Sequence, residues 1–233
     1  MRFGFLGFEF ELPAFTLLSG PMAAAKPLFA QKFIVEFLKV HPDYGILYFA
    51  TSSPVCGVLR NLRIFGMDDE KTRGITFLDY QASCAQIERA DTGYYIGNFS
   101  EPEQLKRALD MASQKSIVVI PSFTLLLIGS EEKELLVDVL VDWLEGRGKR
   151  VVSFVAVNSA MFGDHNRKLA ENADNVLEFL KRGDEVYIRP LKFSGSAPRE
   201  NVPFKFPREM FEGTRKEVAE RTARIIREKK VRK

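Results

Sequence analysis

Apolar residues along the chain gather in short runs, and amphipathic stretches separate these runs. Near-continuous apolar runs are typical of parallel strands that helices cover on both faces. The strands predicted in this way span residues 15–18, 46–50, 116–120 and 151–157. Apolar residues at helical spacing follow the first two runs, over residues 25–40 and 55–65. This alternation predicts an α/β protein with a mostly parallel central sheet.

The segments around these runs are less regular. Residues 1–12 alternate Phe with Gly and Glu, which predicts one or two short strands around a Gly turn, at an edge of the sheet or as a lid on it. Short strands are expected at residues 75–78 and 94–96. The polar stretch between them, residues 81–91, is expected to be a helical turn or a loop.

Capping residues mark the later helices. Ser100 and Glu103 form a capping box for a helix that precedes the strand at residues 116–120. Ser130 is the expected N-cap of the next helix, and Leu135 is expected on the core face of that helix.

The last third of the chain predicts a helix, a hairpin and a linker. The helix covers residues 166–173, and two strands at 176–180 and 185–193 are joined through a turn at 182–184. The proline-rich stretch 194–207 is expected to lie over the surface as a linker.

Charge divides the chain near residue 207. Of the net charge of +3, residues 208–233 contribute ten Lys and Arg against five Glu, or +5, which leaves −2 for residues 1–207. We therefore expect a core domain over 1–207 and a basic C-terminal helix and tail over 208–233, with Thr214 and Glu217 as a capping box. Clustered Lys and Arg bind nucleic acid phosphates in some proteins. A solvated helix end is the other interpretation of this segment.

Composition excludes several classes of protein. No apolar run approaches the roughly 18 residues that a membrane span needs, and the start of the chain lacks the pattern of a signal peptide, so we expect a cytoplasmic protein without membrane contact. Cys56 and Cys84 have neither metal-site nor redox spacing and are expected to be buried thiols. His41 and His165 are the two histidines, and both are expected to be structural. The sequence therefore predicts no metal site.

A degenerate phosphate-binding loop follows the first apolar run. The intact pattern is G-x-x-x-x-G-K-[ST], in which backbone N–H groups hold phosphates, the Lys neutralises them and the hydroxyl binds Mg²⁺. Only Gly20 and Lys26 match this pattern, because Ala25 and Pro27 replace the second Gly and the hydroxyl residue. Pro27 also lacks an N–H and disfavours a helical conformation at Lys26.

Two interpretations of this loop are open. In the first, it is a plain strand-to-helix turn, with Lys26 in solvent. In the second, Gly20 and Lys26 are a residual anion or nucleotide site. The Cβ of Ala25 would crowd a phosphate, and a left-handed conformation there would cost about 1–2 kcal/mol.

The order of these segments resembles the RecA-like ATPases, and among them the archaeal KaiC-like single-domain proteins. The resemblance covers about residues 15–206 and rests on the segments FTLLSGPMAAAKPLFAQKF, GILYFATSSP, KSIVVIPSFTLLL, RPLKFSG and VPFKF. It also extends to small families of hyperthermophilic archaea built on this scaffold. It implies a three-layer sandwich with a mostly parallel central sheet and a C-terminal helix.

The departures from this family concern catalysis. The resemblance implies an acidic, water-activating residue after the second strand, where this chain has Ala50, Thr51 and Ser52, and a metal-orienting Asp where it has Pro121. Together with Pro27, these changes predict a protein that is not an enzyme and has no cofactor or metal. Weak ATP binding stays open.

Two further groups are candidate sites. Asn158, Ser159 and Asp164 follow the strand at 151–157, at the sheet end where ligands bind in such folds, although a small polar loop is ordinary there. The second group corresponds, in RecA-like assemblies, to the face presented to a neighbouring subunit's nucleotide, or is a solvated charged face. Its members are Arg182, Arg189, Lys192 and Arg199.

Three functions remain possible on the sequence. The first is a binding or regulatory subunit that works through a protein partner or a homo-oligomer. The second is a nucleotide or nucleic acid binder that keeps Gly20 and Lys26 as an anion clamp. The third is an unorthodox ATPase.

Overall fold

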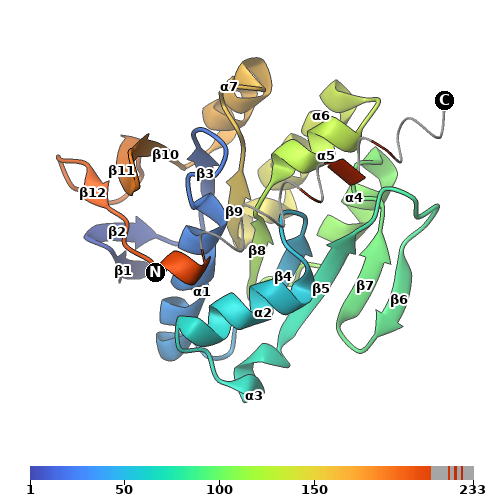
Figure 1. Cartoon of the computed structure of the whole chain (residues 1–233), viewed down its shortest axis with the longest axis horizontal. Coiled ribbons are helices and arrows are strands. Elements are labelled where there is room, and N and C mark those ends of the chain that lie inside the picture. Colours follow the sequence, from blue (N-terminus) through green and yellow to red (C-terminus); the bar gives the residue numbers. More distant parts are fainter. Residues whose placement is uncertain (211–219, 221–222, 225–226, 228–233) are drawn as a thin grey trace.

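A ten-stranded sheet forms the middle layer of the protein (Figure 1). The computed structural model describes residues 1–210, 220, 223–224 and 227. In chain order, the strands are β1 (Arg2–Phe5), β2 (Phe8–Glu11), β3 (Phe15–Ser19), β4 (Gly45–Ala50), β5 (Ile75–Tyr80), β6 (Glu88–Asp91), β7 (Tyr94–Gly97), β8 (Ser116–Ile120), β9 (Val152–Ala156), β10 (Asn175–Arg182), β11 (Glu185–Lys192) and β12 (Val202–Pro203). The order in the large sheet is β12-β11-β10-β3-β9-β8-β4-β5-β7-β6. The strands from β10 to β7 are parallel, and β12, β11 and β6 are antiparallel to their neighbours.

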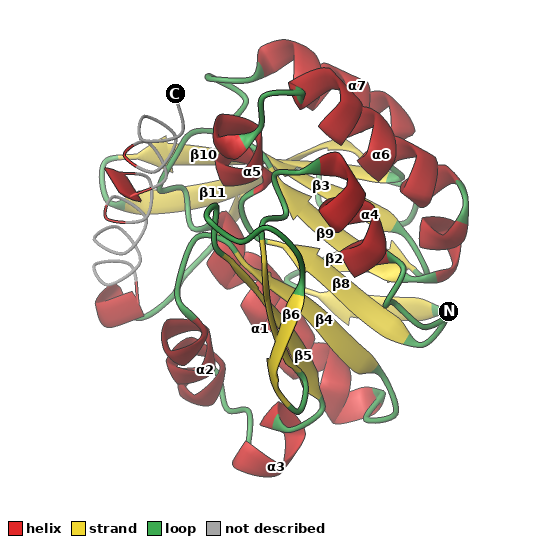
Figure 2. Cartoon of the chain, turned by 90° about the vertical axis from the view of Figure 1, so that its right-hand side faces the viewer, coloured by secondary structure: helices red, strands yellow, loops and turns green. Residues whose placement is uncertain are grey.

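Helices cover both faces of this sheet and complete three layers (Figure 2). They are α1 (Lys26–Val40), α2 (Val55–Ile64), α3 (Asp69–Thr72), α4 (Pro102–Leu109), α5 (Phe123–Gly129), α6 (Lys133–Glu145) and α7 (Gly163–Asn172), with a 3-10 turn η1 (Arg147–Arg150). α1 and α2 share one hydrophobic core with the sheet, and α4 to α7 share the other. The predicted α/β architecture with a mostly parallel sheet is confirmed.

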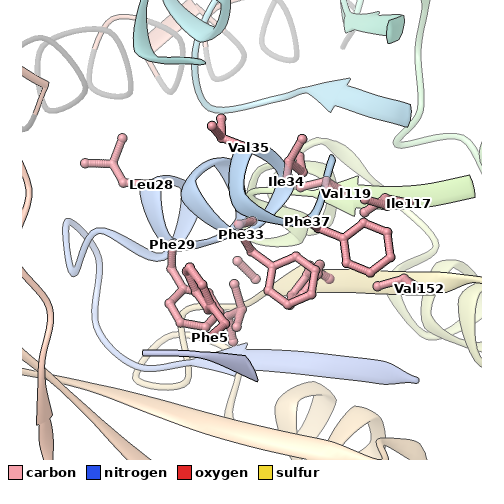
Figure 3. Close-up of a cluster of buried hydrophobic side chains, with 14 of the residues drawn as sticks. Phe5, Leu28, Phe29, Phe33, Ile34, Val35, Phe37, Ile117, Val119 and Val152 are labelled. Carbon is pink, nitrogen blue, oxygen red and sulfur yellow. The ribbon is translucent and has the colours of Figure 1, made fainter. Parts of the chain in front are cut away.

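Phenylalanine side chains fill the first core, between α1, the large sheet and a second, two-stranded sheet formed by β1 and β2 (Figure 3). Phe5 meets Phe29 and Phe33 of α1 edge-on, at ring-centroid distances of 5.2 and 5.3 Å. On its other side, the Phe33 ring lies 4.6 Å from the Phe154 ring of β9. The hairpin at residues 1–12 therefore covers α1, and the expectation that it forms an edge of the large sheet is wrong.

β8 lies near the middle of the large sheet and contributes Val118 and Ile120 to the second core. Leu136, Leu140 and Trp143 of α6 are buried in it. Leu135 is 47% exposed, so its predicted place on the core face is wrong. The buried stripe runs through Leu136 and Leu140, which are one turn apart, and Leu135 lies to its outer side.

Two predicted helix caps are wrong. Ser100 is buried and its hydroxyl donates to Asn98 Oδ1, while α4 begins at Pro102 with no side-chain cap. The apolar residues after β8 form the separate helix α5, and Ser130 follows its last residue. α6 begins only at Lys133, so Ser130 is not its N-cap.

Residues 81–91 contain the strand β6, so the prediction of a helical turn or loop fails for residues 88–91. β6 pairs antiparallel with β7, and Gly93 in the connecting turn has a φ of 70°. All four side chains of β6 are exposed. The strand therefore depends on its pairing with β7 and has no apolar alternation that the sequence could reveal.

The predicted hairpin near the C-terminus is confirmed as β10 and β11, joined through Gly183 and Asp184. The predicted linker contains the short strand β12, and its Ser196 pairs with Glu9 of β2. None of the described helices is long and apolar enough to cross a membrane. The capping box predicted at Thr214 and Glu217 lies outside the described residues.

Candidate functional site

Four of the sequence-predicted positions come together at the carboxyl edge of the parallel strands. Gly20, Thr51 and Pro121 are the first residues after β3, β4 and β8, and Asn158 is the second residue after β9. The order β3-β9-β8-β4 makes these strands consecutive neighbours. Loops at the carboxyl ends of adjacent parallel strands lie side by side, and this edge is where ligands bind in open α/β sheets.

Backbone conformation defines the loop between β3 and α1. Gly20 has a φ of 132°, and a Cβ built there would lie 2.5 Å from Phe179 O, so only glycine fits against β10. Ala23 and Ala25 both have a φ of 56°, in the left-handed region. Each left-handed alanine costs about 1–2 kcal/mol, so the packing around the loop must hold these two residues in place.

The side chain of Lys26 turns back into this loop. Its Nζ donates to Gly20 O at 2.8 Å and to Pro21 O at 2.6 Å, and the residue is only 6% exposed. The interpretation that placed Lys26 in solvent is therefore wrong. Lys26 is also the first residue of α1, with Pro27 after it, so the predicted bias against a helical Lys26 is overridden. Proline is well tolerated in the first turn of a helix.

Burial lowers the pKa of the Lys26 amine from 10.5 to about 7. No carboxylate within the described part of the chain forms an ion pair with it. An uncharged amine keeps two N–H groups, which is the number that the two loop carbonyls accept. The Lys26 amine thus donates its hydrogen bonds to the carbonyls of its own loop.

The residues at this edge do not fit a magnesium–nucleotide complex. Pro27 has no oxygen in its side chain to bind the ion, and Thr51 and Pro121 stand at positions where the family resemblance implies carboxylates. Asp79 is the last but one residue of β5, which lies four strands from β3 in the sheet. At the usual strand spacing, the two strands are about 19 Å apart. Glu178, beside Ser19 on β10, is bound by Arg189.

Hydrogen bonds fasten the neighbouring loops to one another along this edge. Ser159 N donates to Gly20 O at 3.4 Å, and Asn158 N donates to Thr124 Oγ1 at 2.7 Å. Further along, Ser122 N donates to Thr51 Oγ1 at 3.1 Å. The hydroxyls of Thr51 and Thr124 therefore bind backbone N–H groups of adjacent loops.

Some of these residues were absent from the sequence prediction. Ser122 and Thr124 lie in the SFT segment, which follows Pro121 at the end of a buried strand, and that position was the available signal. Ser52, which the sequence also singled out, is buried beside Thr51. Asp164, the second residue of α7, takes another partner: its exposed carboxylate lies 3.5 Å from Arg167 of the same helix.

The predicted basic face interacts within its own chain. Arg189 Nε donates to Glu178 Oε2 at 2.8 Å, and Lys192 Nζ donates to a backbone carbonyl at 3.2 Å. The guanidinium of Arg182 lies 5.6 Å from the centre of the Tyr187 ring. Arg199 is exposed. The first three lie on the β10–β11 hairpin, and Arg199 lies in the segment before β12.

The cysteines and histidines are not among the residues joined by these hydrogen bonds between loops. Cys56 is exposed and Cys84 is half-buried, so the expectation of buried thiols is wrong. His41 stacks near Phe37, with 4.6 Å between ring centres, and His165 lies 3.1 Å from Glu134. In the described ranges, no three His, Cys, Asp or Glu residues form a group that could hold a metal ion.

No protein-family model matches the chain, and no curated protein is similar to it in sequence. Solved structures do share its fold. A KaiC-like protein from the hyperthermophilic archaeon Pyrococcus horikoshii OT3 has a TM-score of 0.60 at 16% identity, over 85% of this chain and 88% of that one. The fold is RecA-like. An uncharacterized protein from Pyrococcus horikoshii, solved in complex with an unknown peptide, has a TM-score of 0.57 at 15% identity, over 83% of this chain and 88% of that one.

The RecA-like comparison confirms the fold expected from the order of the sequence segments. In this scaffold β3, the Gly20–Lys26 loop and α1 form the strand, loop and helix that the degenerate motif predicted. The comparison is one of architecture, and the chemistry of the site rests on the residues of this chain.

Proposed function

We propose that this protein is a RecA-like binding subunit that does not hydrolyse ATP and works through protein–protein contacts. One observation carries the proposal: the Lys26 amine is buried and donates to Gly20 O and Pro21 O of its own loop. An amine held in this way is withdrawn from the surface where a phosphate would lie.

The missing catalytic groups support the first half of the proposal. Phosphoryl transfer depends on positioning and on electrostatic stabilisation by the loop, the metal and a water-orienting residue. Pro27 supplies no hydroxyl for a metal, and the residues that follow β4 and β8 supply no carboxylate. Thr51 instead binds the backbone of the neighbouring loop. Hydrolysis at a useful rate would need each of these groups.

The closed carboxyl edge supports the second half. Hydrogen bonds between loops occupy the N–H groups of Ser122, Asn158 and Ser159 and bind the hydroxyls of Thr51 and Thr124, so these groups are not offered to a small ligand. The Pyrococcus horikoshii protein solved with an unknown peptide shows that one protein of similar fold holds a peptide. Protein contacts by this chain, through a partner or a second copy, are the function most consistent with these features.

A second candidate is nucleotide binding without efficient hydrolysis. Ala23 and Ala25 are left-handed on either side of Ala24, and left-handed residues in such loops are a feature of anion-binding nests. Under this candidate, the Lys26 amine would leave its two carbonyls and meet a phosphate. Nucleic acid binding by residues 208–233 is a further form of this candidate.

Titration with magnesium and ATP separates the two candidates. At a concentration about 100 times the dissociation constant, a ligand stabilises the folded state by about 2.7 kcal/mol, which thermal unfolding detects readily. We expect no rise in melting temperature at about 2 mM MgATP and no release of phosphate. Lys32→Met is the matched control for Lys26→Met, because Lys32 lies on the same helix outside the loop.

Each result has a definite meaning. A rise in melting temperature that Lys26→Met removes and Lys32→Met keeps would favour the nucleotide-binding candidate. Phosphate release that Lys26→Met abolishes would refute the proposal that the protein does not hydrolyse ATP. If the protein bound nucleic acid in a salt-dependent way, and removal of residues 208–233 abolished this binding, that segment would be the nucleic acid contact.

A further inference from the structure

The β10–β11 hairpin, near the end of the large sheet opposite β6, has one face in the first core and one face turned outward (Figure 1). Phe179 of β10 and Ile188 of β11 are a cross-strand pair, and both are buried in that core. Side chains alternate between the two faces of a strand, so the pairs on either side of this one point outward. Three outward pairs form successive rows, and each of their side chains is exposed or half-buried: Glu178–Arg189, Leu180–Tyr187 and Arg182–Glu185. We call these six residues the outer face of the hairpin.

Contacts within the chain join the three rows into one surface. In the first row, Arg189 Nε donates to Glu178 Oε2 at 2.8 Å. Between the second and third rows, the Arg182 guanidinium lies 5.6 Å from the centre of the Tyr187 ring, and the Tyr187 hydroxyl donates to Glu185 Oε2 at 2.6 Å. Side chains that are already ordered lose less entropy on binding, so these contacts favour association through this face.

The charges of the outer face alternate in a pattern that is complementary to itself. In the first row the acidic residue is on β10 and the basic one on β11, and in the third row this order is reversed. A second copy that is turned by 180° about an axis parallel to the strands places its β11 over β10, row over row. Glu178 then faces Arg189 of the second copy, and Arg182 faces Glu185 of the second copy. Unlike charges therefore meet in both charged rows, which favours this partner over one of a single charge sign.

We propose that the outer face of the hairpin binds the same face of a second copy of this chain, about a two-fold axis parallel to β10 and β11. This inference rests on the proposed function and assigns it a partner. In the middle row, Leu180 of each copy faces Tyr187 of the other, so a smaller apolar side chain packs against a larger one. Sheets that pack face to face keep their strands within about 30° of each other, and this axis meets that condition.

The size of this face predicts a weak dimer. Each strand of the hairpin has eight residues, and a strand of this length spans about 27 Å. Two such strands bury less than the roughly 800 Å² per partner of a standard stable interface. We therefore expect a dissociation constant of about 10–100 µM. Added salt should weaken the dimer, because the charged rows remain close to solvent.

Two complementary charge variants test this arrangement by sedimentation. Glu178→Arg leaves only basic residues in the first row, and Arg189→Glu leaves only acidic ones. Each variant alone places like charges opposite each other, so its self-association is expected to weaken about tenfold or more. An equimolar mixture restores unlike charges between the copies and is expected to dimerise within about threefold of the wild-type affinity. Both chains of the mixture keep like charges within their own first row, so an effect inside one chain does not explain such a recovery.

Arg63→Glu is the matched control, because Arg63 also forms an exposed ion pair, with Asp69 at 2.7 Å, between α2 and α3. This variant is expected to leave the dissociation constant of the dimer within about twofold of the wild type. Circular dichroism and thermal unfolding of each variant establish that its fold is retained.

Three outcomes would overturn the inference. A wild-type chain that stays monomeric up to about 500 µM would remove the second copy as the partner. A dimer that neither Glu178→Arg nor Arg189→Glu weakens would use another surface. A mixture that fails to dimerise, although the wild type does, would exclude this axis. Each of these results leaves the proposed function standing with a different partner or surface, because that proposal is tested separately by phosphate release from MgATP.

Discussion

The Lys26 amine is buried, and its hydrogen-bond partners in the described chain are two backbone carbonyls, so no described carboxylate stabilises its protonated form. Desolvation disfavours the ammonium form, which lowers the pKa of Lys26 to about 7. In the unfolded chain the same amine is charged up to about pH 10.5. The folded state therefore binds fewer protons than the unfolded state between these two values. Stability linked to Lys26 must rise with pH across that window.

This linkage predicts the pH dependence of a Lys26→Met variant. The free energy of unfolding of the wild type, relative to Lys26→Met, should be largest above about pH 10.5 and should fall by up to about 1.4 kcal/mol per pH unit down to about pH 7. Below that value it should level off. Urea unfolding of both proteins at several pH values measures the difference. A difference that does not vary with pH would mean that Lys26 keeps an ordinary pKa in the folded protein.

Ala25 gives a second prediction at this scale, because it adopts a φ of 56° at the start of α1. Ala25→Gly should raise the free energy of unfolding by about 0.5–1 kcal/mol, as glycine relieves the left-handed strain but loses more entropy on folding. Ala24→Gly is the control, because Ala24 has no positive φ. This variant should lower the free energy of unfolding by about 0.5–1 kcal/mol. Chemical denaturation compares the two. Equal destabilisation by both would contradict the strain at Ala25.

At the scale of elements, α1 connects the two sheets of the first core. Phe33 contacts Phe3 and Phe5 of β1, Phe10 of β2 and Phe154 of β9, at ring-centroid distances between 4.6 and 5.3 Å. Edge-to-face ring pairs add about 0.5–1.5 kcal/mol each beyond the burial of apolar area. Phe33 is therefore a main contact between the hairpin, α1 and the large sheet.

Phe33→Ala should accordingly lower the free energy of unfolding by about 3–5 kcal/mol. Val40→Ala, at an exposed position on the last turn of the same helix, should change it by less than about 0.5 kcal/mol. Thermal or urea unfolding provides the measurement. If both variants lost the same small amount, the ring cluster would not be the main contact between α1 and the hairpin.

Elements differ in how well their sequence predicts them. Periodicity was sufficient for β3, β4, β8, β9 and α1, because burial on both faces or on one stripe determines their apolar pattern. It was insufficient for β6, whose exposed residues form a strand only through pairing with β7. The strand ends placed Gly20, Thr51, Pro121 and Asn158 at one edge. The direction of the Lys26 side chain was not predictable, since its acceptors are backbone carbonyls that exist only in the folded loop.

At the scale of the whole molecule, both edges of the large sheet are poor templates for further strands. β6 is short, charged and interrupted by an irregularity in its pairing with β7. β12 has two residues and ends in Pro203, and β11 contains Pro190. Short strands, charges and prolines are the devices by which proteins prevent pairing between sheet edges. Any partner is therefore expected to dock on side-chain surfaces.

The close approach of β2 and the segment after β11 gives a prediction at this scale. A Cβ built on Gly195 would lie 2.0 Å from Glu9 O, whereas one on Gly4 would meet nothing within 4 Å. Gly195→Ala should therefore lower the free energy of unfolding by about 1–3 kcal/mol, and Gly4→Ala should have a much smaller effect. Differential scanning calorimetry of both variants checks this. An unchanged midpoint for Gly195→Ala would show that the crossing relaxes freely.

The same crossing constrains when the chain can fold during its synthesis. β3 lies between β9 and β10, and the hairpin at residues 1–12 packs against Phe193 and pairs with Ser196. The hairpin can pack on α1 early, but β3 lacks both strand partners, and the hairpin lacks Phe193 and Ser196, until these later residues have been synthesised. These long-range contacts predict slow completion of the sheet, because pairings between residues far apart in the sequence form late in folding.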